Sequence, residues 1–316
     1  MDAATVILVL LAVAFAWSMG AHYTGACMGM PHAMGSIRLS PALWLMAPLT
    51  LLGAAFLSHR VLFNIGHGIL IAHHMATTTA IAILAAAFAL TTYFTWRRIP
   101  TSTIQILVFS IIGAGLAQGL AIRWGLVFRL ATLWITAPFI AFLLGYAITK
   151  TLDFMPRFAN SGSTGMIGRS LVIVGGAASL AMGANDVSNA TAVFLTTGIS
   201  GPFLAGVLGG IGLAAGVLTW GRPLLERIAF GVVKVDMSMA TAAQLVQAIV
   251  VLAAVLAGYF TSMNQALIGA MTGAGVARGR ETIDRKIIGA VMRGWVIGPV
   301  AGVVLGFLFC RFTQVI

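Results

Sequence analysis

Apolar runs of about 20 residues, separated by short polar segments, recur along almost the whole chain. A helix needs about 20 such residues to cross a hydrocarbon core of about 30 Å, and it satisfies its own backbone hydrogen bonds there. Only 8% of the residues are charged and 60% are hydrophobic, whereas soluble domains are about one quarter charged. The sequence therefore predicts an all-α polytopic membrane protein and excludes a soluble domain.

The apolar runs form two groups of five. They lie at about 4–27, 42–58, 72–95, 103–121 and 126–148, and again at 171–196, 203–220, 241–259, 265–277 and 286–310. The segments that begin near 103 and 265 are short and follow polar breaks, so they are candidates for re-entrant helices. A polar connector separates the groups, and we expect a first repeat at 1–149, a linker at 150–170 and a second repeat at 171–316.

The two groups repeat the same motifs at an offset of about 160 residues. The pairs, which occur in the same order, are Gly20-Ala21 with Gly183-Ala184, Arg60 with Arg222, 101–105 with 261–265, 113–117 with 273–277, and Trp134 with Trp295. Self-similarity at a fixed offset indicates a repeated fold. If each repeat contains about five transmembrane or re-entrant helices, an odd number, the second repeat lies inverted relative to the first.

The basic residues support this inverted arrangement. With the linker in the cytoplasm, most of them fall on the cytoplasmic side and only Arg60, Arg123 and Arg311 lie clearly outside, as the positive-inside rule predicts. The net charge of +11 therefore reflects topology, and we expect no nucleic-acid partner. The predicted location is the cell membrane, crossed several times.

Asp186 is the acidic residue that most constrains function. Of seven acidic residues, it alone lies deep inside an apolar run, where a carboxylate costs several kcal/mol or more unless a cation, a proton or a hydrogen-bonding partner accompanies it. It belongs to the Asn-Asp motif, residues 183–190, with Asn185 and Asn189. We expect this motif to interrupt a membrane helix and to form an ion or anion site; a purely structural, hydrogen-bonded aspartate is the alternative.

A second polar break, which we call the Thr-Ser element, occurs once in each repeat, at 101–105 and 261–265. Serine or threonine at the first position of a helix caps it and leaves hydroxyl and backbone N–H groups directed at one point. Two such ends that meet from opposite faces would form an uncharged oxyanion site. Ordinary capping at the membrane surface is the alternative.

The Asn-Asp motif, the run at 209–228, the Thr-Ser elements and the run at 273–280 together resemble the PiT family of inorganic phosphate transporters. The resemblance is close over the second half of the chain and looser over the first. It implies two inverted repeats and transport of phosphate with Na⁺ or H⁺. It also implies substrate-binding roles for the Asn-Asp motif and both Thr-Ser elements, at Asn185, Asp186, Asn189, Thr261, Ser262, Gln265, Ser102, Thr103 and Gln105.

The first repeat departs from the family pattern. His22 and Tyr23 stand where the family has Asn and Asp, and Gln105 and Gln265 stand where its second motif has histidine. A related sulfate-permease branch also has a degraded first motif, so sulfate is the alternative substrate. Retention of Asp186 favours phosphate, because hydrogen phosphate can donate a proton to a carboxylate and sulfate at neutral pH cannot.

The coupling ion is expected at Asp186 and Asn185. His22 could carry a proton, since its charge changes near neutral pH; a packing or hydrogen-bonding role is the alternative. Four histidines, His59, His67, His73 and His74, gather around one loop, but their spacing fits no standard metal site. We expect no resident metal or cofactor, no enzymatic activity and, as in similar families, a possible homodimer. A passive anion channel is a weaker alternative.

Overall fold

The computed structural model describes residues 2–66, 69–70, 75–154, 164–229, 235–279 and 285–313. These residues are helical apart from turns, loops and one isolated bridge between Leu70 and Ile122. The helices are α1 (Ala3–His22), α2 (Thr24–Ala33), α3 (Leu39–Leu57), α4 (His59–Gly66), α5 (Thr77–Trp96), α6 (Thr103–Gln118), α7 (Trp124–Asp153), α9 (Thr164–Thr191), α10 (Val193–Thr196), α11 (Pro202–Trp220), α12 (Arg222–Ala229), α13 (Met237–Leu256), α14 (Met263–Arg278) and α15 (Arg285–Thr313).

The predicted all-α membrane fold is confirmed. Within the described ranges, eight helical stretches are long and apolar enough to span a membrane. The helices α6 and α14 have 16 residues each, or about 24 Å at 1.5 Å per residue, which is less than the thickness of the hydrocarbon core. Their length is what a re-entrant helix requires.

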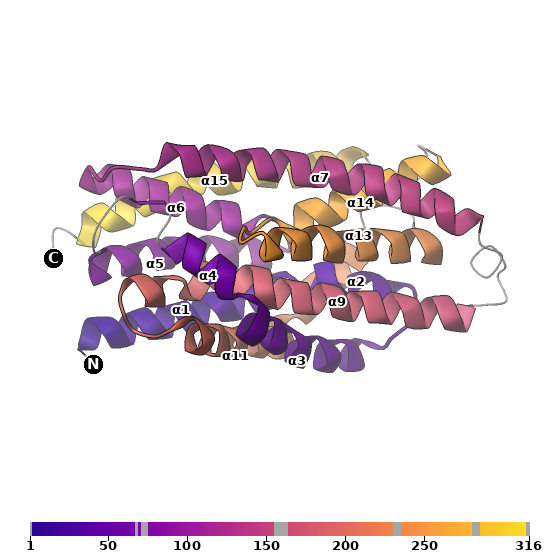
Figure 1. Cartoon of the computed structure of the whole chain (residues 1–316), viewed down its shortest axis with the longest axis horizontal. Coiled ribbons are helices and arrows are strands. Elements are labelled where there is room, and N and C mark those ends of the chain that lie inside the picture. The colour runs from indigo at the N-terminus through magenta and orange to yellow at the C-terminus, as the bar shows by residue number, and fades with distance from the viewer. Residues whose placement is uncertain are drawn as a thin grey trace.

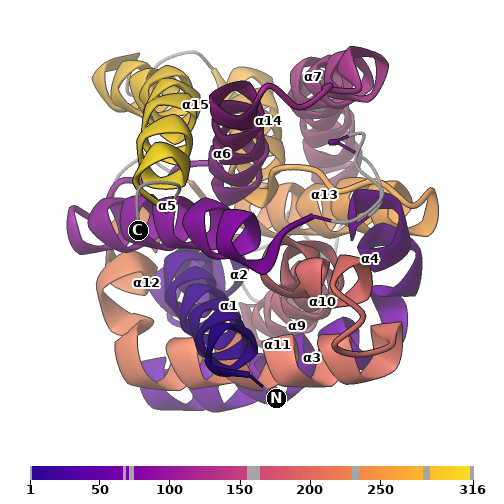
Figure 2. The same ribbon diagram turned by 90° about the vertical axis from the view of Figure 1, so that its left-hand side faces the viewer.

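Helices of one half pack against helices of the other in matched pairs. The helix α6 lies against α15 and α14 against α7, while α3 lies against α9 and α1 against α11. Along the long axis of the molecule, α5 and α6 lie toward the left end and α13 and α14 toward the right (Figure 1). An end view separates α1, α3, α9 and α11 below from α6, α7, α14 and α15 above (Figure 2). Such matched pairs support the predicted repeat; the orientation of each half in the membrane stays a prediction.

The connection between the halves is shorter than the predicted linker. The helix α7 continues to Asp153 and α9 begins at Thr164, so both ends of the 150–170 segment are helical. Residues 155–163 lie outside the described ranges. On α12, Arg222 and Glu226 form an ion pair one helical turn apart, with the Arg222 Nε atom 2.8 Å from Glu226 Oε1.

The expected helix interruption at the Asn-Asp motif is wrong. The helix α9 runs unbroken through residues 183–190 and ends at Thr191. Gly183 serves close packing instead, because a Cβ there would lie 1.9 Å from the carbonyl oxygen of Thr50. The side chains of Asn185, Asp186 and Asn189 find partners outside the backbone of α9, so they do not compete with its hydrogen bonds.

Glycines let the paired helices approach backbone to backbone. A Cβ built on Gly216 of α11 would lie 1.8 Å from the carbonyl oxygen of Trp17, and one on Gly273 of α14 would lie 1.9 Å from that of Phe142. The sequence places glycines four residues apart, as at Gly269 and Gly273, and small residues at this spacing permit such contacts in membranes. Larger side chains would force these helices apart.

We therefore expect Gly273→Ala to destabilise the contact between α14 and α7. The added methyl group must displace the backbone at Phe142, and overpacking of this kind costs about 1–3 kcal/mol. Thermal unfolding in detergent, followed by gel filtration, should show a midpoint lowered by several degrees. Gly125→Ala is the matched control, because nothing lies within 4 Å of a Cβ built there; equal midpoints for the two variants would contradict the packing role.

Candidate functional site

The N-terminal ends of α6 and α14 meet inside the protein. Ser102 caps α6 and Ser262 caps α14, each hydroxyl oxygen accepting a hydrogen bond of 3.4 Å from the backbone N–H three residues later. The amide of Gln105 donates to the Oε1 atom of Gln265 across 3.5 Å. The predicted capping by the Thr-Ser elements is therefore present, and it occurs in the interior, since all these side chains are at most 7% exposed.

Two facing helix N-termini form a favourable environment for an anion. The first N–H groups of a helix lack intrahelical partners and carry partial positive charge. Backbone donors of this kind bind phosphate and related anions in many proteins. Here they are combined with the hydroxyl groups of Thr101, Ser102, Thr103, Thr261 and Ser262, all of which are buried.

Asp186 lies fully buried beside these helix ends. Its Oδ2 atom accepts a hydrogen bond of 3.1 Å from the Asn185 amide, and its Oδ1 atom accepts one of 3.4 Å from the Asn189 amide. None of the ion pairs found among the described side chains includes Asp186. Two neutral amide donors leave the charge itself uncompensated, so a proton or a bound cation must accompany the carboxylate.

Asn185 holds the second Thr-Ser element in place. Its Oδ1 atom accepts from the Thr261 N–H and its Nδ2 atom donates to the Thr261 carbonyl oxygen, both at 2.9 Å. One side chain of α9 thus satisfies both backbone groups of a residue that precedes α14. The same Nδ2 atom also reaches Asp186, which connects the carboxylate to the helix end.

His22 holds the first Thr-Ser element in the corresponding way. Its Nε2 atom accepts from the Thr101 N–H at 3.2 Å, and its Nδ1 atom lies 2.9 Å from the Thr95 hydroxyl. The Thr95 hydroxyl donates to the Thr91 carbonyl, so Nδ1 carries the proton and the ring is neutral. These contacts support the hydrogen-bonding role; the role of His22 as a proton carrier stays a prediction.

Two residues of the site were not among the predicted binding residues. The hydroxyl of Tyr23 lies 2.8 Å from the Thr103 hydroxyl, and the amide of Asn264 donates to the Thr101 carbonyl across 2.7 Å. The sequence held a signal for both. Tyr23 occupies the position that Asp186 has in the other repeat, and Asn264 lies within the second Thr-Ser element.

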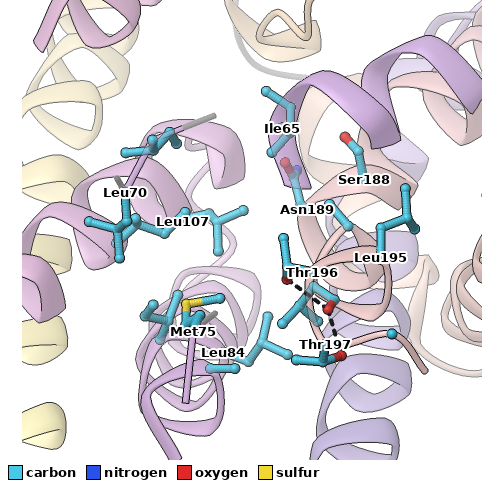
Figure 3. A pocket seen from close by; sticks show the side chains of 17 residues that line it. Ile65, Leu70, Met75, Leu84, Leu107, Ser188, Asn189, Leu195, Thr196 and Thr197 are labelled. Atoms are coloured by element: carbon cyan, nitrogen blue, oxygen red, sulfur yellow. Dashed lines mark hydrogen bonds between the residues drawn. The ribbon is translucent and has the colours of Figure 1, made fainter. Parts of the chain in front are cut away.

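A cavity of about 380 Å³ lies beside this site and is lined by residues of α4, α5, α6, α9 and α10. Its walls are mostly aliphatic, with Leu84 from α5 and Leu107 from α6 facing α9 and α10 (Figure 3). Asn189 and Ser188 supply polar groups at the wall formed by α9. Since the Asn189 amide also contacts Asp186, the cavity reaches to within one side chain of the carboxylate.

Several buried amide oxygens near the site have no hydrogen-bond partner. They belong to Asn189, Gln105 and Asn264. A buried acceptor without a partner is unfavourable. These oxygens are therefore suited to accept a hydrogen bond from a protonated anion or to contact a cation.

The histidine group around the loop after α4 lies mostly outside the described residues. Of its four members, His67, His73 and His74 lie outside the described residues. Where the chain is described, no three histidine, cysteine or acidic side chains come together as metal ligands would.

Comparison with known proteins gives consistent results. The model of the phosphate transporter family matches residues 19–166 and 156–306. A relative from Thermococcus kodakarensis whose name places it among phosphate permeases is 26% identical over 98% of each chain. A sulfate permease of Bacillus subtilis is 24% identical over 95% of this chain and 85% of its own. A solved sodium-dependent phosphate transporter has the same fold, with a TM-score of 0.93, 19% identity and full coverage of both chains.

Replacement of Asn185 by leucine tests the clamp on Thr261, by which we mean the two hydrogen bonds between the Asn185 side chain and the Thr261 backbone. The variant leaves a buried N–H and a buried C=O without partners, at about 1–3 kcal/mol each, and we expect a thermal midpoint in detergent at least 5 °C below that of the parent protein. Asn64→Leu removes one hydrogen bond from an exposed side chain to the Gly258 carbonyl and should change the midpoint little. A parent-like midpoint for Asn185→Leu would show that the clamp does not stabilise the fold.

Proposed function

Because the chain belongs to the phosphate transporter family, we propose that it is a secondary active transporter that carries inorganic phosphate across the membrane together with Na⁺ or H⁺. The observation that carries the proposal is Asp186, a fully buried carboxylate beside two facing helix N-termini, which forms no ion pair with any side chain in the described ranges. A transporter that carries an anion together with a cation needs a site where the two ions stabilise each other. In this proposal the helix N-termini serve the anion and Asp186 serves the cation.

The groups of the site suit hydrogen phosphate. The helix N-termini and the threonine and serine hydroxyls offer donors to its unprotonated oxygens. Asp186 offers an acceptor to its one P–OH group. Sulfate at neutral pH has no proton to donate and is repelled by a bare carboxylate, so it requires a neutralised Asp186.

The coupling cation binds, in this proposal, at Asp186 with Asn185. Carboxylate and amide oxygens are hard ligands of the kind that alkali and alkaline-earth cations prefer. The structurally similar transporter is named sodium-dependent, which favours Na⁺ over H⁺. A cation at Asp186 would remove the unfavourable buried charge and let the anion bind next to it.

Sulfate is the second candidate substrate. The sulfate permease of Bacillus subtilis aligns with most of the chain, and the first repeat here lacks one carboxylate of the family pattern. We propose that the protein is not an enzyme, and we place the linker at 150–170 in the cytoplasm on the distribution of basic residues. We also propose that two copies of the chain form a homodimer.

Alternating access can be read from the difference between the two halves. The offset of 160 residues that aligns the Thr-Ser elements aligns Leu84 of α5 with Gln244 of α13. Leu84 lines the open cavity, whereas Gln244 is fully buried and donates from Nε2 to the carbonyl of Ala26 on α2 at 2.9 Å. We infer that the pathway is open along α5 and that Gln244 latches the opposite pathway along α13.

Transport assays in proteoliposomes test the function. We expect labelled phosphate to accumulate only when a Na⁺ or pH gradient is imposed, and Asp186→Asn to lower accumulation at least tenfold because the cation loses its charged ligand. Labelled sulfate is measured in parallel. Uptake that equilibrates without any gradient would indicate a channel, and full activity of Asp186→Asn would remove that residue from the mechanism.

Labelling of Cys27 tests the latch. Cys27 follows Ala26 on α2 and is fully buried, so a Cys310→Ser background leaves it as the only thiol. Gln244→Leu, which copies Leu84, should raise the maleimide labelling rate of Cys27 about fivefold, since the buried hydrogen bond from Gln244 to the Ala26 carbonyl contributes about 1 kcal/mol.

Gln118→Leu is the control for the latch. It also removes a glutamine hydrogen bond, to Thr79 at 2.6 Å, but between α6 and α5 rather than at α2. Equal labelling rates for Gln244→Leu and the parent protein would contradict the latch.

A further inference from the structure

Tyr23 corresponds to Asp186 in the alignment of the two repeats. The motif Gly20-Ala21-His22-Tyr23 aligns with residues 183–186. The preceding residue has the same task in each repeat, because His22 accepts from the Thr101 N–H as Asn185 accepts from the Thr261 N–H. By this alignment, a phenol stands in the first repeat where a carboxylate stands in the second.

The hydroxyl of Tyr23 is part of the same hydrogen-bonded group as Asp186. It lies 2.8 Å from Thr103 Oγ1, which also accepts from the Asn189 amide at 3.4 Å. That amide reaches Asp186 Oδ1. Tyr23 itself is fully buried, and its ring stands edge-on to that of His22 with centroids 5.3 Å apart. Packing thus fixes the hydroxyl between the two repeats.

A phenol and a carboxylate differ in charge and in hydrogen bonding. The phenol is neutral and can donate a hydrogen bond to an anion, whereas the carboxylate is charged and can only accept. Each carboxylate buried in apolar surroundings requires a cation or proton. A site with Tyr23 in place of a second carboxylate therefore needs one positive charge fewer.

We propose that Tyr23 is a specificity-determining residue of the oxyanion site, which gives the anion a neutral donor and lowers by one the number of cations carried with it. The inference rests on the proposed function, because it assumes that an oxyanion and a cation move together. The inference concerns the number of cations carried with each anion, and this ratio does not depend on whether the anion is phosphate or sulfate.

The experiment compares Tyr23→Asp and Tyr23→Phe in proteoliposomes that contain the full chain. The ratio of labelled Na⁺, or of protons, to labelled phosphate taken up is measured for each. Tyr23→Asp should raise this ratio by about one, since it adds a second buried carboxylate. Tyr23→Phe should keep the ratio and lower the apparent phosphate affinity about tenfold, as expected for the loss of one hydrogen bond to a charged group. Tyr146→Phe, which removes the hydroxyl of a tyrosine on α7 that is 41% exposed, should match the parent protein.

A second measurement separates failure of this inference from failure of the proposed function. The thermal stability of the purified protein is followed as a function of Na⁺ and of pH, without any anion. Tyr23→Asp should show a steeper cation dependence than the parent protein, whichever anion is transported. If the parent accumulates sulfate instead of phosphate, the proposed substrate is wrong, and the ratio of cations to sulfate tests the role of Tyr23. If the parent accumulates neither anion, the cation dependence of thermal stability tests that role.

The inference is overturned if folded Tyr23→Asp has the parent's cation ratio and cation dependence, or if Tyr23→Phe retains the parent's anion affinity. Should Tyr23→Asp fail to fold, the double variant His22→Asn with Tyr23→Asp replaces it. This variant reproduces the pair that residues 185 and 186 form in the other repeat, with its clamp on the helix end.

Discussion

A backbone N–H or C=O group that a helix end leaves unpaired must find a partner inside the protein when the surroundings are hydrocarbon. The helices α6 and α14 begin in the interior, so the residues before them carry this requirement. The Asn185 side chain pairs with the N–H and C=O groups of Thr261. His22 pairs with the N–H group of Thr101, and Asn264 pairs with its C=O group. The polar cluster exists first to hold two helix ends together in an apolar interior. The same arrangement leaves donors directed toward Asp186.

The sequence predicted the helices and most residues of this cluster, though not Tyr23 and Asn264, because both depend on composition along the chain. Runs of apolar residues define the membrane helices, and a lone Asp186 among them identifies the site. The continuity of α9 was not predictable in this way. Asn185 and Asn189 favour turns when they stand alone, and only the partners supplied by Thr261, Thr103 and Asp186 make an unbroken helix compatible with them.

Contacts between distant segments were also beyond the sequence. The hydrogen bond between Gln105 and Gln265 joins residues 160 positions apart, and neither residue type alone indicates a partner. Tyr23 shows the same limit. A tyrosine in an apolar run is an ordinary packing residue by composition, and its hydroxyl acquires a role only because Thr103 is 2.8 Å away. The open cavity beside Asn189 depends on how α5 packs and has no counterpart in a motif.

The glycine contacts have a consequence for how such a molecule can move. They fasten α1 to α11, α3 to α9, α6 to α15 and α7 to α14 with backbone against backbone. The two helices between these fastened groups, α5 and α13, contain no glycine and present mainly alanine, threonine and aliphatic side chains. They lie against α1 and α9. Smooth faces of this kind allow one rigid group to slide past the other in a shear displacement, with the candidate site around Asp186 on the sliding plane.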